Sequence, residues 1–199
     1  MKMSNFTFSE ADHVYRLDNL ELVSVTTIIK PLSDYSMIPY AILEAARQWG
    51  NNVHLMVKLH LEDDLDEDTL DEPLRMPMEA LRQWEADYPS IISGIGHIER
   101  PGYHKKLLYA GTPDLCGDTV IDVKSRVVNR LCDPLQTLLY DHMTGDGKRD
   151  HYILELRVDG KYVFTPVNQT KKERERNWSR ARYLLDFHRM QSEIKLWGK

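Results

Sequence analysis

The sequence predicts one domain that combines short β-strands with α-helices. Its 199 residues are enough for one well-packed core, and the hydrophobic share of 42% is ordinary for a globular domain. Strand-like patterns occupy 6–22, 107–123 and 152–167, whereas helical patterns occupy 39–61, 78–88, 133–144 and 170–196. Strands and helices therefore recur along the whole chain, and we expect a single unit, residues 1–199, rather than two domains.

The strongest functional signal lies between Ala110 and Arg126, where the chain reads AGTPDLCGDTVIDVKSR. Two apolar runs flank a Gly-Asp turn, which is typical of a β-hairpin. Side chains alternate between the two faces of a strand, so Asp122 and Lys124 share one face. If Asp114, before the turn, points to the same side, two carboxylates and an amine converge.

The length of the turn decides whether these three side chains converge. A loop of only Gly117 and Asp118 would point Asp114 away from Asp122. A three-residue loop that includes Thr119, with Gly117 free to adopt a positive φ, restores a common face. We therefore predict the three-residue loop, or strands that diverge at Asp114.

Such a cluster suits a hard divalent cation. Two close aspartates repel one another unless a cation lies between them, and carboxylate oxygens are ligands that Mg²⁺ and Mn²⁺ prefer. The backbone carbonyl of Val123 can add a ligand. A lysine two residues after the second aspartate can hold or deprotonate a water molecule, or neutralise charge on a phosphate. The alternative is a turn cap at Asp114 and a solvated strand face, because Asp-x-Lys is common by chance.

These residues resemble the signature of the PD-(D/E)XK nuclease superfamily, here as Pro113-Asp114 followed by Asp122-Val123-Lys124. The opening HVYRLDNLELVSVTTII, residues 13–29, resembles the start of RecB-like exonucleases of phages. The resemblance implies an α/β fold: a central mixed β-sheet flanked by α-helices, known as a restriction-endonuclease-like core. It also implies an N-terminal elaboration of β-hairpin and helix, and we expect a long C-terminal helix.

Three further motifs follow the order of the RecB-like and lambda-type branch. His54 ends a Gly-Asn-Asn-Val-His element that resembles Gly-Thr-x-Val-His, whose histidine contributes to a metal site, although asparagine replaces the usual threonine. Glu99 matches a glutamate that binds the metal directly or through water. Gln136 and Tyr140 match a Gln-x-x-x-Tyr motif that places the lysine or the DNA backbone. Plainer alternatives are a core histidine, an exposed glutamate, and a core tyrosine with a surface glutamine.

The resemblance implies hydrolysis of phosphodiester bonds at DNA ends, with Mg²⁺ or with Mn²⁺ in its place, during phage or prophage recombination or repair. The implied site has Lys124 beside the attacking water and these metal ligands: Asp114, Asp122, the Val123 carbonyl, Glu99 and His54. A structure- or sequence-specific endonuclease would use the same residues. A non-catalytic DNA-binding protein that kept the fold is the third alternative.

The net charge of −5 divides unevenly, into −11 over residues 1–99 and +6 over residues 100–199. This division favours a basic DNA-binding face built mainly from the second half, although most charge runs only solvate a surface. The predicted DNA contacts are Arg126, Arg130, Lys105 and Lys106, with Gln136 and Tyr140 in support. Family analogy suggests a single-strand annealing protein as partner and leaves a homo-oligomer open.

The two cysteines, Cys116 and Cys132, are too few for a disulfide framework or an iron–sulfur cluster. The N-terminus lacks a basic segment followed by an apolar one, and no apolar stretch is long enough to span a bilayer. We therefore expect a soluble protein of the bacterial or phage-infected cytoplasm that has no membrane partner.

Local signals predict several element boundaries. The helix over 39–61 should be interrupted at Gly50–Asn52, and a strand should run from Lys105 to Cys116. Asp133 should cap the helix that starts at 133. Asp159-Gly160 should form a hairpin turn, and Thr170–Glu173 should form a capping box at the start of the last helix.

Overall fold

The computed structural model describes residues 5–197, with side chains described to residue 193. Ten strands in this range are β1 Phe6–Ser9, β2 Val14–Leu17, β3 Leu20–Ser24, β4 Ile95–Ile98, β5 Gly102–Tyr103, β6 Tyr109–Gly111, β7 Leu115–Gly117, β8 Thr119–Lys124, β9 Asp150–Leu156 and β10 Tyr162–Val167. Six α-helices in the same range are α1 Val25–Ile29, α2 Tyr40–Leu61, α3 Arg75–Asp87, α4 Pro89–Ser93, α5 Asp133–Thr144 and α6 Lys171–Trp197. Short 3₁₀ turns lie at Lys30–Leu32, Glu67–Thr69 and Glu72–Leu74.

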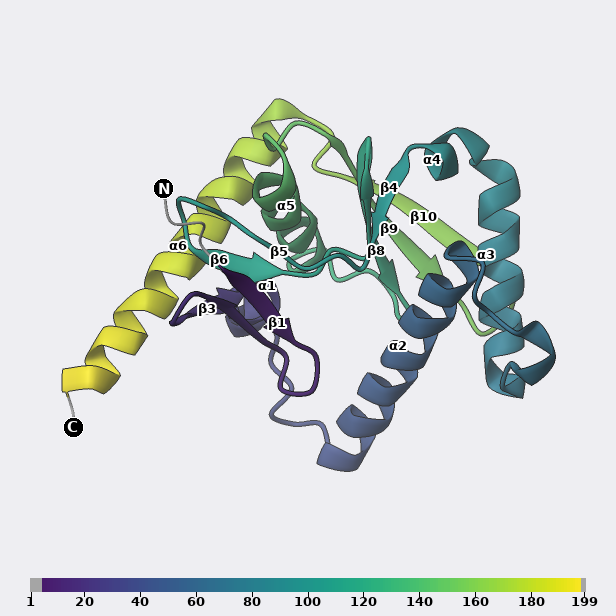
Figure 1. The fold of residues 1–199 in the computed structure, drawn as a ribbon, viewed down its shortest axis with the longest axis horizontal. Coiled ribbons are helices and arrows are strands. Elements are labelled where there is room, and N and C mark those ends of the chain that lie inside the picture. The colour runs from purple at the N-terminus through teal and green to yellow at the C-terminus, as the bar shows by residue number, and fades with distance from the viewer. Residues whose placement is uncertain (1–4, 198–199) are drawn as a thin grey trace.

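A five-stranded mixed sheet forms the centre of the fold, in the order β10-β9-β8-β7-β4. β8 and β9 are parallel, and the other neighbours are antiparallel. Helices α2 and α3 cover one face, while α5, backed by α1 and α6, covers the other (Figure 1). Along β8, Ile121 and Val123 pack toward α2 and α3, whereas Val120 packs toward α5. The predicted α/β class, with a central mixed sheet between helices, is confirmed.

A second five-stranded sheet, in the order β1-β2-β3-β6-β5, is joined to the central sheet by two crossings. The chain leaves the central sheet after β4 to enter β5, and it returns from β6 into β7. At the crossings the amide of Glu99 donates to the carbonyl of Asp114 at 2.8 Å. The joint between the two sheets therefore sets these two predicted site residues side by side.

The predicted local signals are confirmed at the later hairpin and at the last helix. Gly160 has a φ of +77°, which allows the tight turn between β9 and β10. At the start of α6, the Glu173 amide donates to the Thr170 hydroxyl at 3.2 Å, and the Thr170 amide donates to the Glu173 carboxylate at 3.1 Å. This reciprocal pair is the predicted capping box.

The predicted interruption of the helix over 39–61 is wrong, because α2 continues through Gly50–Asn52. A glycine inside a helix costs roughly 1 kcal/mol relative to alanine. Beyond it, Val53, Met56 and Val57 are buried against the central sheet and α3. Their burial offsets the local preference, so packing keeps the helix continuous up to His54 and beyond.

Two other boundaries differ from prediction. The expected strand from Lys105 to Cys116 is divided into β6 and β7, because residues 112–114 cross between the sheets and Pro113 has no amide for a ladder bond. Asp133 is the first residue of α5 rather than its cap. Its carboxylate instead accepts from the Asn129 amide at 2.6 Å and binds the Arg126 guanidinium, which ties the preceding loop to α5.

The turn between β7 and β8 is the predicted three-residue loop. Cys116 pairs with Val120 and Leu115 pairs with Ile121, which leaves 117–119 as the connection. The expected positive φ at Gly117 is wrong, because among the described glycines it occurs at Gly147 and Gly160. Gly117 is needed for another reason: a Cβ there would lie 1.9 Å from the carbonyl oxygen of Gly94.

None of the helices within residues 5–197 combines the length and the apolar composition needed to cross a membrane.

Gly117→Ala should lower the free energy of unfolding by about 1–3 kcal/mol or more, because the added methyl overlaps backbone that cannot move aside easily. Gly50→Ala is the matched control. Its Cβ would meet only the Ser125 hydroxyl at 3.7 Å, and it should stabilise the helix by roughly 0.5–1 kcal/mol. Urea unfolding measures both. Equal effects of the two substitutions would contradict the close approach at Gly117.

Candidate metal centre

Asp114 and Asp122 lie next to one another at the end of the β7–β8 ladder. Continuing the register from Leu115 and Ile121 by one residue places the two aspartates opposite each other. Asp122 is fully buried and Asp114 is 9% exposed. One Asp114 oxygen, Oδ2, accepts from the Val123 amide at 2.7 Å, which fixes the carboxylate against β8. The convergence that depended on loop length is therefore present.

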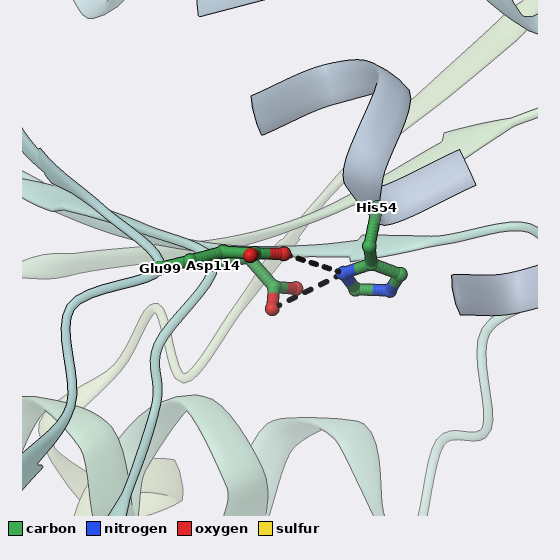
Figure 2. A group of neighbouring side chains, drawn as sticks. All are labelled: His54, Glu99 and Asp114. Atoms are coloured by element: carbon green, nitrogen blue, oxygen red, sulfur yellow. Dashed lines mark ion pairs between the residues drawn. The ribbon is translucent and has the colours of Figure 1, made fainter. Parts of the chain in front are cut away.

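His54 and Glu99 complete a cluster around Asp114. His54 projects from α2, and its Nδ1 lies 3.3 Å from Asp114 Oδ1 and 3.8 Å from Glu99 Oε1 (Figure 2). One ligand atom from each of the three residues falls within 4.8 Å of the others, a spacing that could hold a metal ion. The ring nitrogen of His54 comes from α2. The carboxylate of Glu99 comes from the β4–β5 crossing, and that of Asp114 comes from the β6–β7 crossing.

Lys124, Gln136 and Tyr140 form a chain of contacts from β8 to α5. The Lys124 ammonium lies 2.6 Å from Asp122 Oδ2 and donates to Gln136 Oε1 at 3.3 Å. The Gln136 amide then donates to the Tyr140 hydroxyl at 3.2 Å. A Cβ at Gly111 would lie 2.7 Å from the Tyr140 ring, so the glycine leaves the space that the ring occupies.

The buried carboxylate of Asp122 is incompletely satisfied by its neighbours. Neither of its buried oxygens has a hydrogen-bond partner among the described residues, although Oδ2 is close to Lys124. The distance shows an ion pair, but its angles are not those of a hydrogen bond. Burial and the charge of Asp114 raise the pKa of Asp122 to about 7, although Lys124 acts in the opposite direction. The site therefore has unused capacity for a positive partner.

Burial and the charges of the centre also shift the pKa values of Asp114, His54 and Glu99. Burial alone would raise the pKa of Asp114, but the charge and hydrogen bond of His54 outweigh it and lower that pKa. Burial would lower the pKa of His54, and Asp114 more than reverses the effect. The pKa of Glu99 is raised, first by burial and then by Asp114. The pKa values of these groups are therefore shifted in different directions within one small volume.

The other predicted DNA contacts lie outside this cluster. The Arg126 guanidinium binds both oxygens of Asp133, at 3.0 and 2.7 Å. Arg130 is exposed in the loop that follows β8. Lys105 and Lys106 are exposed in the turn between β5 and β6, at the far end of that hairpin from the two crossings. The group with metal-ligand spacing thus consists of His54, Glu99 and Asp114, with Asp122, Lys124 and the Gln-Tyr pair beside it, and these four residues are not part of it.

Sequence reasoning missed Lys58. Its ammonium lies 4.0 Å from Glu99 Oε2, and it is four residues after His54 on the same face of α2. That spacing is the signal that could have identified it, since helix residues four apart are neighbours. To use this signal, one would have to know that α2 is continuous and that Glu99 lies beside it.

Comparison with models of known protein families finds no match, and comparison with curated proteins finds none either. The interpretation of the centre therefore depends on its geometry and on the resemblance of its motifs.

Mg²⁺ or Mn²⁺ should raise the Tm, because an ion that binds only the folded chain stabilises it by about 2.7 kcal/mol at 100 times its Kd. Asp114→Asn and Asp122→Asn should each remove most of this shift. A ligand must lose its proton to bind, and burial raises the pKa of Asp122 to about 7. The shift should therefore be largest at pH 8 and decline as the pH falls through 7.

Thermal unfolding with and without metal at pH 6, 7 and 8 measures this effect. Asp159→Asn is the control, because that aspartate is exposed in the β9–β10 turn and forms its ion pair with Arg157, not with a residue of the centre. An unchanged metal-induced shift in Asp122→Asn would show that the ion binds elsewhere.

Proposed function

We propose that this chain is a Mg²⁺- or Mn²⁺-dependent nuclease of the PD-(D/E)XK type that hydrolyses phosphodiester bonds at DNA ends. The observation that carries the proposal is the arrangement of Asp114, Asp122 and Lys124. The three-residue loop sets the two buried carboxylates opposite each other and the lysine beside them. Metal-assisted phosphodiester hydrolysis can use carboxylates that hold a cation and a basic group that acts on water or phosphate.

The donor set fits a hard divalent cation. Carboxylate oxygens of Asp114, Asp122 and Glu99, the Val123 carbonyl and a His54 nitrogen would hold it. The unpartnered oxygens of Asp122 support this fit, because buried carboxylates are normally satisfied by hydrogen bonds. A bound cation would supply Lewis-acid stabilisation of the phosphate and a water of lowered pKa.

Lys124 is positioned to act on the attacking water or on a phosphate oxygen. A lysine ammonium has three N–H donors. Gln136 accepts from one of them, and the ammonium forms an ion pair with Asp122. Tyr140 accepts a hydrogen bond from the Gln136 amide, so the acceptor of Lys124 is itself held in place. An ammonium that is held by one hydrogen bond and one ion pair, with donors still open, suits a positioning role better than a freely moving side chain would.

A solvated hairpin face is the plainer alternative, and burial weighs against it. That interpretation requires Asp122 to be exposed, whereas the residue is fully buried. An incompletely paired buried charge costs stability, and such costs concentrate at functional sites. The preference for DNA ends, the role in recombination or repair and a single-strand annealing partner come from the family resemblance alone.

The decisive experiment compares end-labelled linear duplex, single-stranded and closed circular DNA with Mg²⁺ or Mn²⁺. We expect linear DNA to be degraded from its ends and closed circles to survive. Lys124→Ala and Asp122→Ala should each reduce the rate on the order of 10⁴-fold, as for groups that act as a unit. Both variants should remain folded by circular dichroism.

Lys161→Ala and Asp159→Asn are the matched controls, since both residues lie at the β9–β10 turn. Nicking of closed circles would favour the endonuclease alternative. A gel shift without cleavage of any substrate would favour the non-catalytic DNA-binding alternative. Cleavage by Lys124→Ala at the wild-type rate would refute the assigned site.

A further inference from the structure

A cleft of about 490 Å³ opens beside the candidate metal centre. It lies between the C-terminal part of α2, which contributes Lys58 and Glu62, and the segment from Ile95 to Pro101. Glu99 belongs both to the cleft and to the centre. Its Oε1 faces His54 Nδ1 at 3.8 Å, while its Oε2 faces the Lys58 ammonium at 4.0 Å. A ligand that reaches the centre can therefore extend into the cleft.

Basic side chains gather in this cleft although most of its lining residues come from the acidic half of the chain. Lys58, His97 and Arg100 line it, and the Arg100 guanidinium lies 3.4 Å from His97 Nδ1. Within the described residues, His97 and Arg100 form no ion pair with a carboxylate, and Lys58 reaches only Glu99 at the limit of one. Glu62 is the other carboxylate of the cleft and is exposed.

The spacing from the centre suits a neighbouring phosphate. Lys58 follows His54 by one helical turn, so their Cβ atoms are about 5–6 Å apart. A cation held by Glu99 Oε1 would weaken the attraction between that carboxylate and Lys58, which would leave the ammonium available to an anion. Arg100 directly follows Glu99 in the chain and is exposed at the same opening.

We propose that this cleft binds the DNA backbone beside the bond to be cleaved, with Lys58 and Arg100 contacting phosphate and His97 next to them. The inference rests on the proposed nuclease function and adds to it a path for the strand: from the metal centre over Glu99 and along β4. The ligand class is the phosphodiester backbone, so these contacts position the strand and read no base.

The salt dependence of DNA binding tests the cleft. Binding of labelled linear duplex is measured by anisotropy over a range of salt, in a Lys124→Ala background with Mg²⁺. Lys58→Gln and Arg100→Gln should each weaken binding and reduce the slope of log K against log salt by roughly 0.9, the value of one duplex phosphate contact. The double variant should lose about twice as much. Lys161→Gln, at the β9–β10 turn, should leave the slope unchanged.

Two outcomes would overturn the proposal. One is an unchanged salt slope in both cleft variants. The other is loss of the metal-induced Tm shift in Lys58→Gln with the slope intact, which would mean that Lys58 only supports Glu99. The salt slopes test DNA binding by the cleft whether or not the wild-type chain cleaves DNA. A failure of this proposal can therefore be distinguished from a failure of the nuclease proposal.

Discussion

The pairing register between β7 and β8 is the constraint on which the rest of the site depends. Side chains alternate along β8, so a slip of one residue would exchange its two faces. Asp122 and Lys124 would then enter the apolar core against α2 and α3, and Ile121 and Val123 would leave it. Gly117 holds the register, because only a residue without a Cβ lets the Gly94 carbonyl approach so closely.

The buried aspartates near helix α5 differ in how completely they are paired. Three aspartates near it are fully buried: Asp122, Asp133 and Asp141. Asp133 is satisfied by Arg126 and an amide, and Asp141 binds Arg149 at 2.7 Å and His151 at 2.8 Å. The fold can thus supply complete partners to buried carboxylates where they serve structure. Its failure to do so at Asp122 fits a group whose partner comes from outside the chain.

Local chemistry explains which features the sequence could predict. Strand alternation, the odd loop at 117–119 and the Thr170–Glu173 box depend on residues close in the chain, and all three are present. The continuity of α2 and the crossing at residues 112–114 depend on packing against distant elements, and they were not predicted. His54 and Lys58 reach Glu99 only because both conditions hold. The composition of the site was therefore more predictable than its geometry.

The uneven charge of the two halves predicts the surface poorly, because folding interleaves them. β4 comes from the acidic half, yet it pairs with β7 of the basic half. Arg126 belongs to the basic half, but its charge is committed to Asp133. Lys58 belongs to the acidic half and stands beside the candidate metal centre. A strand bound at the candidate centre would respond to the few cations within its reach, since more distant charges are screened beyond about 10 Å.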